Sequence, residues 1–151
     1  MAGRGGRGGR GGRYRVIAVG GTRMKNAALR AACDDYLSRI RHYAKIEERE
    51  VKEARVPPPE DSRLIALARD GEAWTSEHLA ELTAQWERDA RDVTFIIGSA
   101  DGLPEEILRR AERIWSLGPL TLPHELARVV LYEQLYRAHT IRRGEPYHRR
   151  S

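Results

Sequence analysis

Residues 115–138 read WSLGPLTLPHELARVVLYEQLYRA. The first part of this stretch predicts a short loop followed by a buried strand at residues 120–122. Pro123 suits the first turn of a helix, because it lacks the N–H that a first turn leaves unpaired and its φ already fits the helix. The apolar spacing that follows predicts a helix over residues 126–138.

The predicted helix is apolar around most of its circumference. At 100° per residue, Glu133, Gln134 and Arg137 form one narrow polar arc. The core of the domain covers one side of such a helix, and we expect a second copy of the protein to cover the other. Arg128 projects among apolar side chains, where a guanidinium requires a partner. Two partners stay open, a carboxylate in an intersubunit ion pair or an anionic ligand.

The composition fits one globular domain, since the chain has 151 residues and 40% of them are hydrophobic. Four arginines in residues 1–13 supply four of the five net positive charges, which leaves the rest of the chain at +1. This Arg- and Gly-rich tail is expected to be disordered, and either to bind RNA loosely or to be dispensable. The single cysteine, Cys33, is expected in the core. Without a membrane-length apolar run or a secretory segment, we expect a soluble, cytoplasmic protein.

Strands and helices alternate along residues 14–151, which we interpret as a single domain. This order predicts an α/β fold with a mostly parallel sheet flanked by helices. The Pro-rich connection at residues 52–63 has no room for a crossover helix. The expected strands are residues 14–19, 46–51 (an exposed edge), 64–67, 93–97 and 120–122, and the expected helices are residues 25–43, a helix capped by residues 75–77, 104–115 and 126–138.

Ligands of open parallel sheets bind at the carboxyl ends of the strands. There, glycines such as Gly98 and Gly118 allow close backbone approach, and nearby leucines offer apolar walls that suit a flat adenine ring. His124, at the helix start, is either a site residue or a structural histidine. Tyr147 and His148 lie in a polar tail with no core to join, where stacking on a base or proton exchange with it is expected. The histidines show no metal-ligand spacing, so no metal is expected.

Several motifs together resemble the ribosomal RNA large subunit methyltransferase H family of the SPOUT superfamily. They are FIIG-x-x-x-G at residues 95–102, SL-x-x-LTLPH at 116–124, RVVL-x-EQLYRA at 128–138 and PYH at 146–148. The resemblance implies a homodimer whose carboxyl-terminal part is tied into a trefoil knot that binds S-adenosyl-L-methionine. It also implies methylation of N3 of a pseudouridine in the large-subunit (23S) rRNA of the assembled ribosome.

The resemblance further implies site residues. The reaction would be an in-line displacement at a sulfonium methyl group, assisted by one weak base that removes the N3 proton. His148 or Tyr147 would be this base or would orient it, Arg128 would hold an rRNA phosphate or the donor's carboxylate, and His124 would lie on the catalytic side. The residues expected to line the methyl-donor site are Leu67, Gly98, Leu117, Gly118, Pro119, Leu120, Thr121 and Leu122.

The chain departs from the family pattern at several points. The Pro-rich connection stands in place of a helix between the second and third strands. Ala68 stands where an acidic residue is expected, Ser99 stands for the second glycine of a pair, and the Arg- and Gly-rich tail is foreign to the family. Two other functions stay open, a non-catalytic RNA- or ribosome-binding protein of the same fold and a SPOUT methyltransferase with another RNA target. Deleting residues 1–13 is expected to weaken ribosome binding at low salt.

Overall fold

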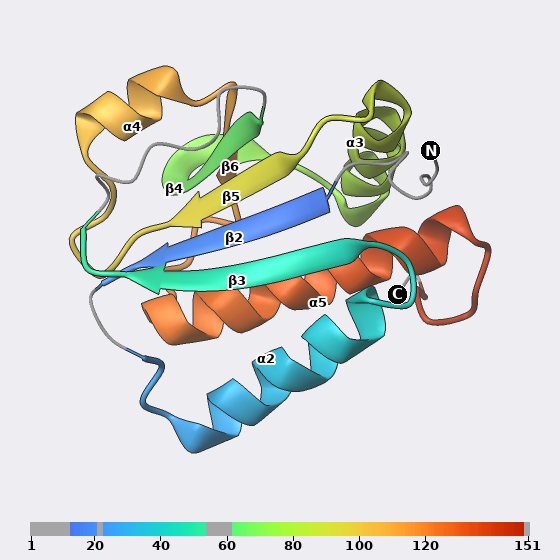
Figure 1. The fold of residues 1–151 in the computed structure, drawn as a ribbon, viewed down its shortest axis with the longest axis horizontal. Helices are drawn as coiled ribbons and strands as arrows, with labels where there is room; N and C mark the ends of the chain where they lie inside the picture. The colour runs from blue at the N-terminus through green and yellow to red at the C-terminus, as the bar shows by residue number, and fades with distance from the viewer. Residues whose placement is uncertain (1–12, 21–22, 54–61, 150–151) are drawn as a thin grey trace, which may run out of the picture.

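The computed structural model describes residues 13–20, 23–53 and 62–149. Parallel strands form a five-stranded sheet in the order β3-β2-β5-β4-β6 (Figure 1), which confirms the expected α/β class. The strands are β2 (Arg13–Val19), β3 (Lys45–Val51), β4 (Arg63–Ala73), β5 (Val93–Ile97) and β6 (Arg113–Ser116), and the helices are α2 (Ala27–Ile40), α3 (Ser76–Asp89), α4 (Glu105–Arg110) and α5 (His124–Arg142).

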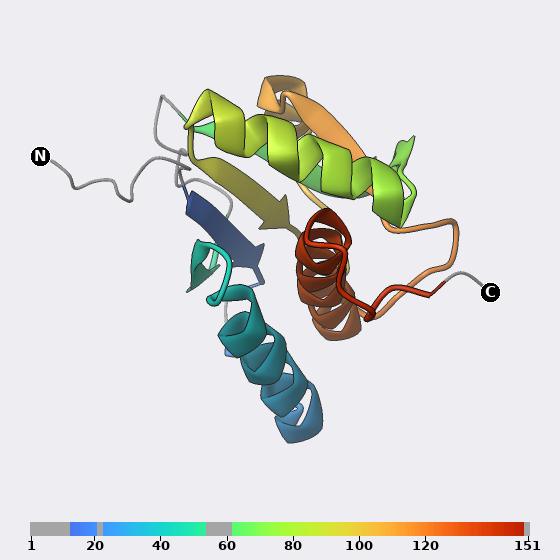
Figure 2. The ribbon, with the colours of Figure 1, turned by 90° about the vertical axis from the view of Figure 1, so that its right-hand side faces the viewer.

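Helices cover both faces of the sheet (Figures 1 and 2), and each face has its own core cluster. The larger cluster packs α2, α3 and α5 against Val16, Ile65 and Phe95, which are fully buried. The smaller cluster lies on the other face of the sheet. There α4 packs against Ile17 and Ile96, which follow Val16 and Phe95 in their strands. This alternation follows from the two-residue period of a strand, and it explains why β5, in the interior of the sheet, is buried at all five positions.

Side-chain caps fix the starts of α2 and α3. The Asn26 side chain accepts a hydrogen bond from the backbone N–H of Leu29 at 3.0 Å, and Thr75 accepts one from His78 at 2.9 Å. The predicted cap at Thr75 is therefore confirmed. Cys33, on the inner face of α2, is fully buried, as expected from its place on the apolar face.

The segment between α4 and α5 differs from the prediction. The helix that starts after Pro104 ends at Arg110, and residues 113–116 form β6 beside β4 instead of a further helical turn. The strand expected at residues 120–122 is wrong, because these residues form a loop. A short apolar run such as Ile114-Trp115 fits a helix face and a strand equally well, so long-range pairing with β4 decides its state.

Helix α5 begins at His124 with Pro123 as its N-cap, and it extends beyond residue 138 to Arg142. Its inner face is fully buried through Leu131, Tyr132 and Leu135. Leu126 and Val130, on another side of the helix, are half-buried and belong to neither core cluster.

Two predictions concern segments without a structural description. Residues 1–12 of the predicted tail lie outside the described residues, while Arg13 opens β2. Residues 54–61, most of the Pro-rich connection, lie outside them as well, so its expected lack of a helix stays a prediction. Within the described ranges, no helix combines the length and the apolar character needed to cross a bilayer.

Candidate functional site

The middle of β4 and the carboxyl ends of β5 and β6 meet around a cavity of about 490 Å³. This volume lies in the range of roughly 300–1,000 Å³ typical of small-molecule sites. The location is the one expected for a ligand of a parallel sheet. The cavity is lined by Leu67, Ala68, Arg69, Ile97, Gly98, Ser99, Ala100, Gly102, Trp115, Leu117, Gly118, Leu120, Thr121, Leu122, Pro123, His124 and Ala127.

One wall of the cavity is the tight turn that follows β5. The backbone N–H of Gly102 donates to the carbonyl oxygen of Ser99 at 2.9 Å, and Gly102 has a φ of +80° that favours glycine. This turn folds closely over Gly98, where a Cβ atom would lie 2.8 Å from the backbone of Gly102. Gly98 is therefore required by the turn itself, and the wall that faces the cavity consists largely of backbone.

The opposite wall is the loop of residues 117–123. The Ser116 hydroxyl accepts a hydrogen bond from the N–H of Gly118 at 3.1 Å, and Gly118 has a φ of +131°. Farther along the loop, Thr121 accepts a hydrogen bond from Arg69 Nη1 at 3.1 Å, which ties the loop to the middle of β4. Leu120 leaves 75% of its surface exposed, although it lines the cavity. It gives the wall an apolar side chain that a ligand could cover.

The structure brings together most of the residues predicted to line a methyl-donor site. Leu67, Gly98 and five loop residues line this single cavity, while Pro119 lies on the same loop outside the lining. Sequence reasoning missed Arg69 and Ala127. Arg69 comes two residues after the predicted strand 64–67, and Ala127 lies one helical turn after Pro123, so strand-end and helix-start positions were the available signals.

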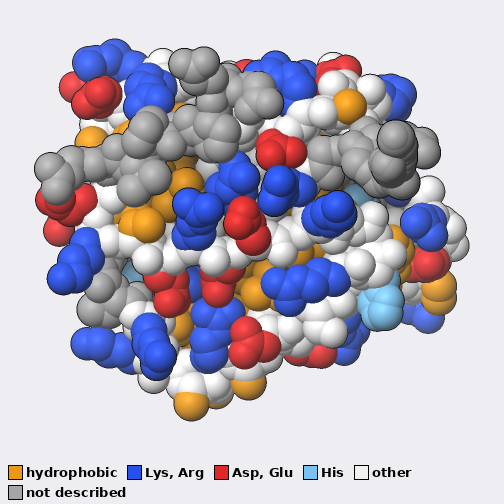
Figure 3. Space-filling view, viewed as in Figure 1, with side chains coloured by type: hydrophobic (Ala, Val, Ile, Leu, Met, Phe, Trp, Pro, Cys, Tyr) orange, Lys and Arg blue, Asp and Glu red, His pale blue; other side chains and the backbone are white. Residues whose placement is uncertain are grey.

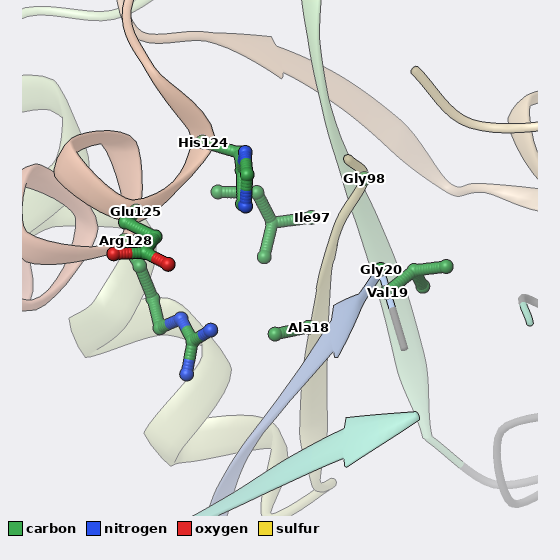
Figure 4. A pocket seen from close by; sticks show the side chains of 8 residues that line it. All are labelled: Ala18, Val19, Gly20, Ile97, Gly98, His124, Glu125 and Arg128. Atoms are coloured by element: carbon green, nitrogen blue, oxygen red, sulfur yellow. The ribbon is translucent and has the colours of Figure 1, made fainter. Parts of the chain in front are cut away.

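A smaller pocket adjoins this cavity and shares Ile97, Gly98 and His124 with it (Figure 4). Its other residues come from the end of β2 and from the first turns of α5. His124 thus lies between the two hollows, at the edge of the larger cavity. In Figure 4 the guanidinium of Arg128 points away from His124.

Arg128 is 4% exposed and pairs with carboxylates of its own chain. Its Nη1 atom lies 3.1 Å from Glu48 Oε2 and 2.8 Å from Glu50 Oε2, both on β3. Glu48 also accepts hydrogen bonds from the Tyr132 hydroxyl at 2.6 Å and from Arg30 at 3.3 Å. Arg128 thus has two carboxylate partners on β3 of its own subunit, whereas the sequence left open an intersubunit carboxylate or an anionic ligand.

The Glu48 carboxylate is the centre of this network. Burial opposes its charge, but hydrogen bonds from Tyr132, Arg30 and Arg128 outweigh burial and lower the pKa of Glu48. The carboxylate is thus ionised at neutral pH and compensates the buried guanidinium. Arg128 has the role of fixing β3 against α5 in this structure, beside the small pocket.

Tyr147 and His148 pack on α5, contrary to the expectation that the tail has nothing to join. The Tyr147 hydroxyl donates to Glu133 at 2.8 Å, and His148 lies 3.0 Å from Arg137 Nη1 and 3.0 Å from Glu77 Oε2. Burial, followed by hydrogen bonds with Tyr36 and Glu133, raises the pKa of Tyr147. Glu133 and Arg137, one helical turn apart on α5, form an ion pair at 2.7 Å that is the platform for both rings. Neither tail residue lines the cavity or the small pocket.

Charge is mixed on the molecular face shown in Figure 3, where Lys and Arg side chains alternate with Asp and Glu. Over the part of the chain that the structure describes, no three His, Cys, Asp or Glu side chains cluster as metal ligands do. The lining of the cavity offers apolar walls, backbone groups, the hydroxyls of Ser99 and Thr121, one histidine and one arginine.

Comparison with known proteins connects this geometry to a family. A family model described as a predicted SPOUT methyltransferase matches residues 13–148. A protein of Sorangium cellulosum named ribosomal RNA large subunit methyltransferase H is 46% identical over 144 residues, which cover 89% of this chain and 98% of that protein. A protein of the same name from an Anaeromyxobacter strain is 42% identical, with 91% of this chain and 99% of the other covered.

Solved structures share the fold at low sequence identity. A probable methylase family protein of Haemophilus influenzae matches with a TM-score of 0.63 at 10% identity, over 92% of this chain and 71% of that chain. The SpoU methyltransferase AviRb of Streptomyces viridochromogenes, solved in complex with AdoMet, matches with a TM-score of 0.53 at 11% identity, over 91% and 60% of the two chains.

Proposed function

The chain belongs to the ribosomal RNA large subunit methyltransferase H family of SPOUT methyltransferases, and from this premise we propose that it transfers a methyl group from S-adenosyl-L-methionine to N3 of a pseudouridine in 23S rRNA. The substrate is the assembled ribosome, so the reaction takes place in the cytoplasm. The observation that carries the proposal is the cavity between β4, the ends of β5 and β6, and the loop before α5, which gathers most of the predicted donor-site residues in one place.

The lining of this cavity fits the methyl donor. Leu67, Leu117, Leu120 and Leu122 give apolar surface for an adenine ring, and the turn over Gly98 gives backbone groups that can hydrogen-bond to its edge. When bound there, S-adenosyl-L-methionine supplies a methyl group on a sulfonium sulfur. The protein then has to hold the rRNA base in line and accept the N3 proton.

The candidate catalytic residues take different parts in this proposal. His124 lies at the rim of the donor cavity and faces the incoming base. Arg128, already compensated by two carboxylates, acts as a positioning residue for the wall beside His124. His148 is the proposed catalytic base that accepts the N3 proton. Tyr147, whose raised pKa keeps it protonated, orients His148.

A homodimer explains how the tail can reach a donor site. Tyr147 and His148 do not line the cavity of their own chain, and Leu126 and Val130 leave an apolar side of α5 half-covered. Packing of two α5 helices would cover that side and bring the tail of one subunit to the cavity of the other. The carboxyl-terminal path from β6 at the sheet edge through α5, which packs against α2 and α3, is the part that we propose to be tied as a trefoil knot.

Calorimetric titration with S-adenosyl-L-methionine tests the donor site. We expect one site per subunit in the wild-type protein and loss of binding in Thr121→Trp, because an indole at this exposed lining position fills the cavity without entering the core. Arg49→Met, on the exposed edge strand, is the matched control and should bind normally. A folded wild-type protein that binds no donor would refute the proposal and favour a non-catalytic RNA-binding protein.

Mixing two inactive variants tests the shared site. Thr121→Trp lacks a donor cavity and His148→Ala lacks the proposed base, so each homodimer should fail to methylate ribosomes. A heterodimer of the two holds one cavity and one tail that are both intact, and coexpression should restore methylation. If the mixture stays inactive although heterodimers form, the tail does not act across the subunits.

A further inference from the structure

Arg69 occupies a distinctive place at the rim of the donor cavity. Strand β4 pairs with β6 at Leu67 and resumes pairing at Glu72, so residues 68–71 bulge out of the sheet at its carboxyl edge. This bulge directs Arg69 to the cavity, where its Nη1 atom donates to the Thr121 hydroxyl on the opposite wall. The guanidinium therefore joins two walls of the cavity and is held by a neutral group.

The charge of Arg69 is uncompensated among the described residues. The lining contains no Asp or Glu, and apart from Arg69 its one titratable side chain is His124. Arginines nearby differ in this respect, since Arg113 pairs with Glu72 at 3.0 Å and Arg128 pairs with two carboxylates of β3. Arg69 is exposed, so its guanidinium is open to a ligand, and a guanidinium beside apolar walls suits an anionic group of that ligand.

We propose that Arg69 binds the carboxylate at the amino-acid end of the methyl donor, with Thr121 holding the guanidinium in place. This inference rests on the proposed function. An adenine ring against the apolar walls leaves the amino-acid end at the rim, and the carboxylate is the one anionic group of this ligand. The planar guanidinium can give two parallel hydrogen bonds to a carboxylate, and Nη1 can be kept in position by Thr121.

Two ligands that differ at the amino-acid end test the assignment by calorimetry. S-adenosylhomocysteine carries the carboxylate, whereas 5′-methylthioadenosine lacks the whole amino-acid end. We expect Arg69→Met to raise the dissociation constant of S-adenosylhomocysteine at least about ten-fold, as for loss of a charge-assisted hydrogen bond, and to leave that of 5′-methylthioadenosine unchanged. Thr121→Val should give the same pattern with a smaller loss, and Arg49→Met should change neither constant.

The outcomes separate this assignment from the function on which it rests. Equal losses for the two ligands, or no loss for either, overturn the role of Arg69 while donor binding stands. Unchanged S-adenosylhomocysteine affinity combined with weaker ribosome binding by Arg69→Met also overturns it, and assigns Arg69 to an rRNA phosphate. A wild-type protein that binds neither ligand overturns the proposed function, and the Arg69 assignment with it.

Discussion

His139 is a buried histidine whose surroundings oppose the charged form of its imidazole. Its Nε2 atom lies 2.8 Å from the Tyr14 hydroxyl, its ring stacks on Tyr43, and it is 4% exposed. Burial, with the nearby positive charge of Arg142, lowers the pKa of His139 to about 4. The imidazole is therefore neutral in the folded protein at neutral pH, where it can share a hydrogen bond with Tyr14.

The low pKa of His139 predicts an acid-sensitive fold. An unfolded histidine titrates near pH 6.5, so between about pH 6.5 and 4 the unfolded chain binds more protons and the folded state loses stability as the pH falls. From this group we expect the free energy of unfolding to be about 2 kcal/mol lower at pH 5 than at pH 7.5. Urea unfolding at the two pH values measures it.

His139→Gln is the matched variant, because an amide can still hydrogen-bond to Tyr14 but does not titrate. The difference in unfolding free energy between the two pH values should shrink in this variant by the amount that His139 contributes. An unchanged difference would show that other groups cause the acid sensitivity.

Ion pairs between Arg128 on α5 and two carboxylates on β3 hold these two elements together. Replacing Arg128 by Met removes the more buried of the two cations that Glu48 and Glu50 share, and leaves them with the partly exposed Arg30. Removing one partner of a buried pair costs about 3 kcal/mol, and more where the charge is fully buried. We therefore expect Arg128→Met to lower the free energy of unfolding by this amount in urea titrations.

A double-variant cycle separates the ion pair from lost packing. Glu48→Gln removes one of the two charges facing Arg128, so Arg128→Met should be less harmful in a Glu48→Gln background than in the wild-type protein. Additive effects of the two substitutions would contradict the network, because they would mean that the two side chains act independently.

Elements with strong local signals could be predicted from the sequence. The cap at Thr75, the buried strand β5 and the start of α5 after Pro123 each follow from residues within one or two turns. Strand β6 could not, because Ile114 and Trp115 take their state from pairing with β4, which is distant in the chain. Residues 120–122 form a loop although their apolar run is typical of a strand, since Leu120 and Leu122 line a cavity that several elements build together.

Side-chain partners across the whole molecule were the least predictable feature. The sequence showed that Arg128 needs a partner, but only the pairing of β3 with β2 brings Glu48 and Glu50 to it. The position of Tyr147 and His148 depends likewise on how the chain folds back on α5 after residue 142. The donor-site residues were found mainly through the family resemblance, and the fold explains why they belong to one cavity.

At the scale of the whole molecule, we propose that the protein binds its donor in this cavity and methylates large-subunit rRNA. Nucleoside mass spectrometry of 23S rRNA measures this methylation most directly, on ribosomes from cells that lack the gene, before and after incubation with the protein and S-adenosyl-L-methionine. We predict one new N3-methylated pseudouridine with the wild-type protein and none with Thr121→Trp. A new methyl group on a different nucleotide, or no new methyl group from a protein that binds the donor, would contradict the account.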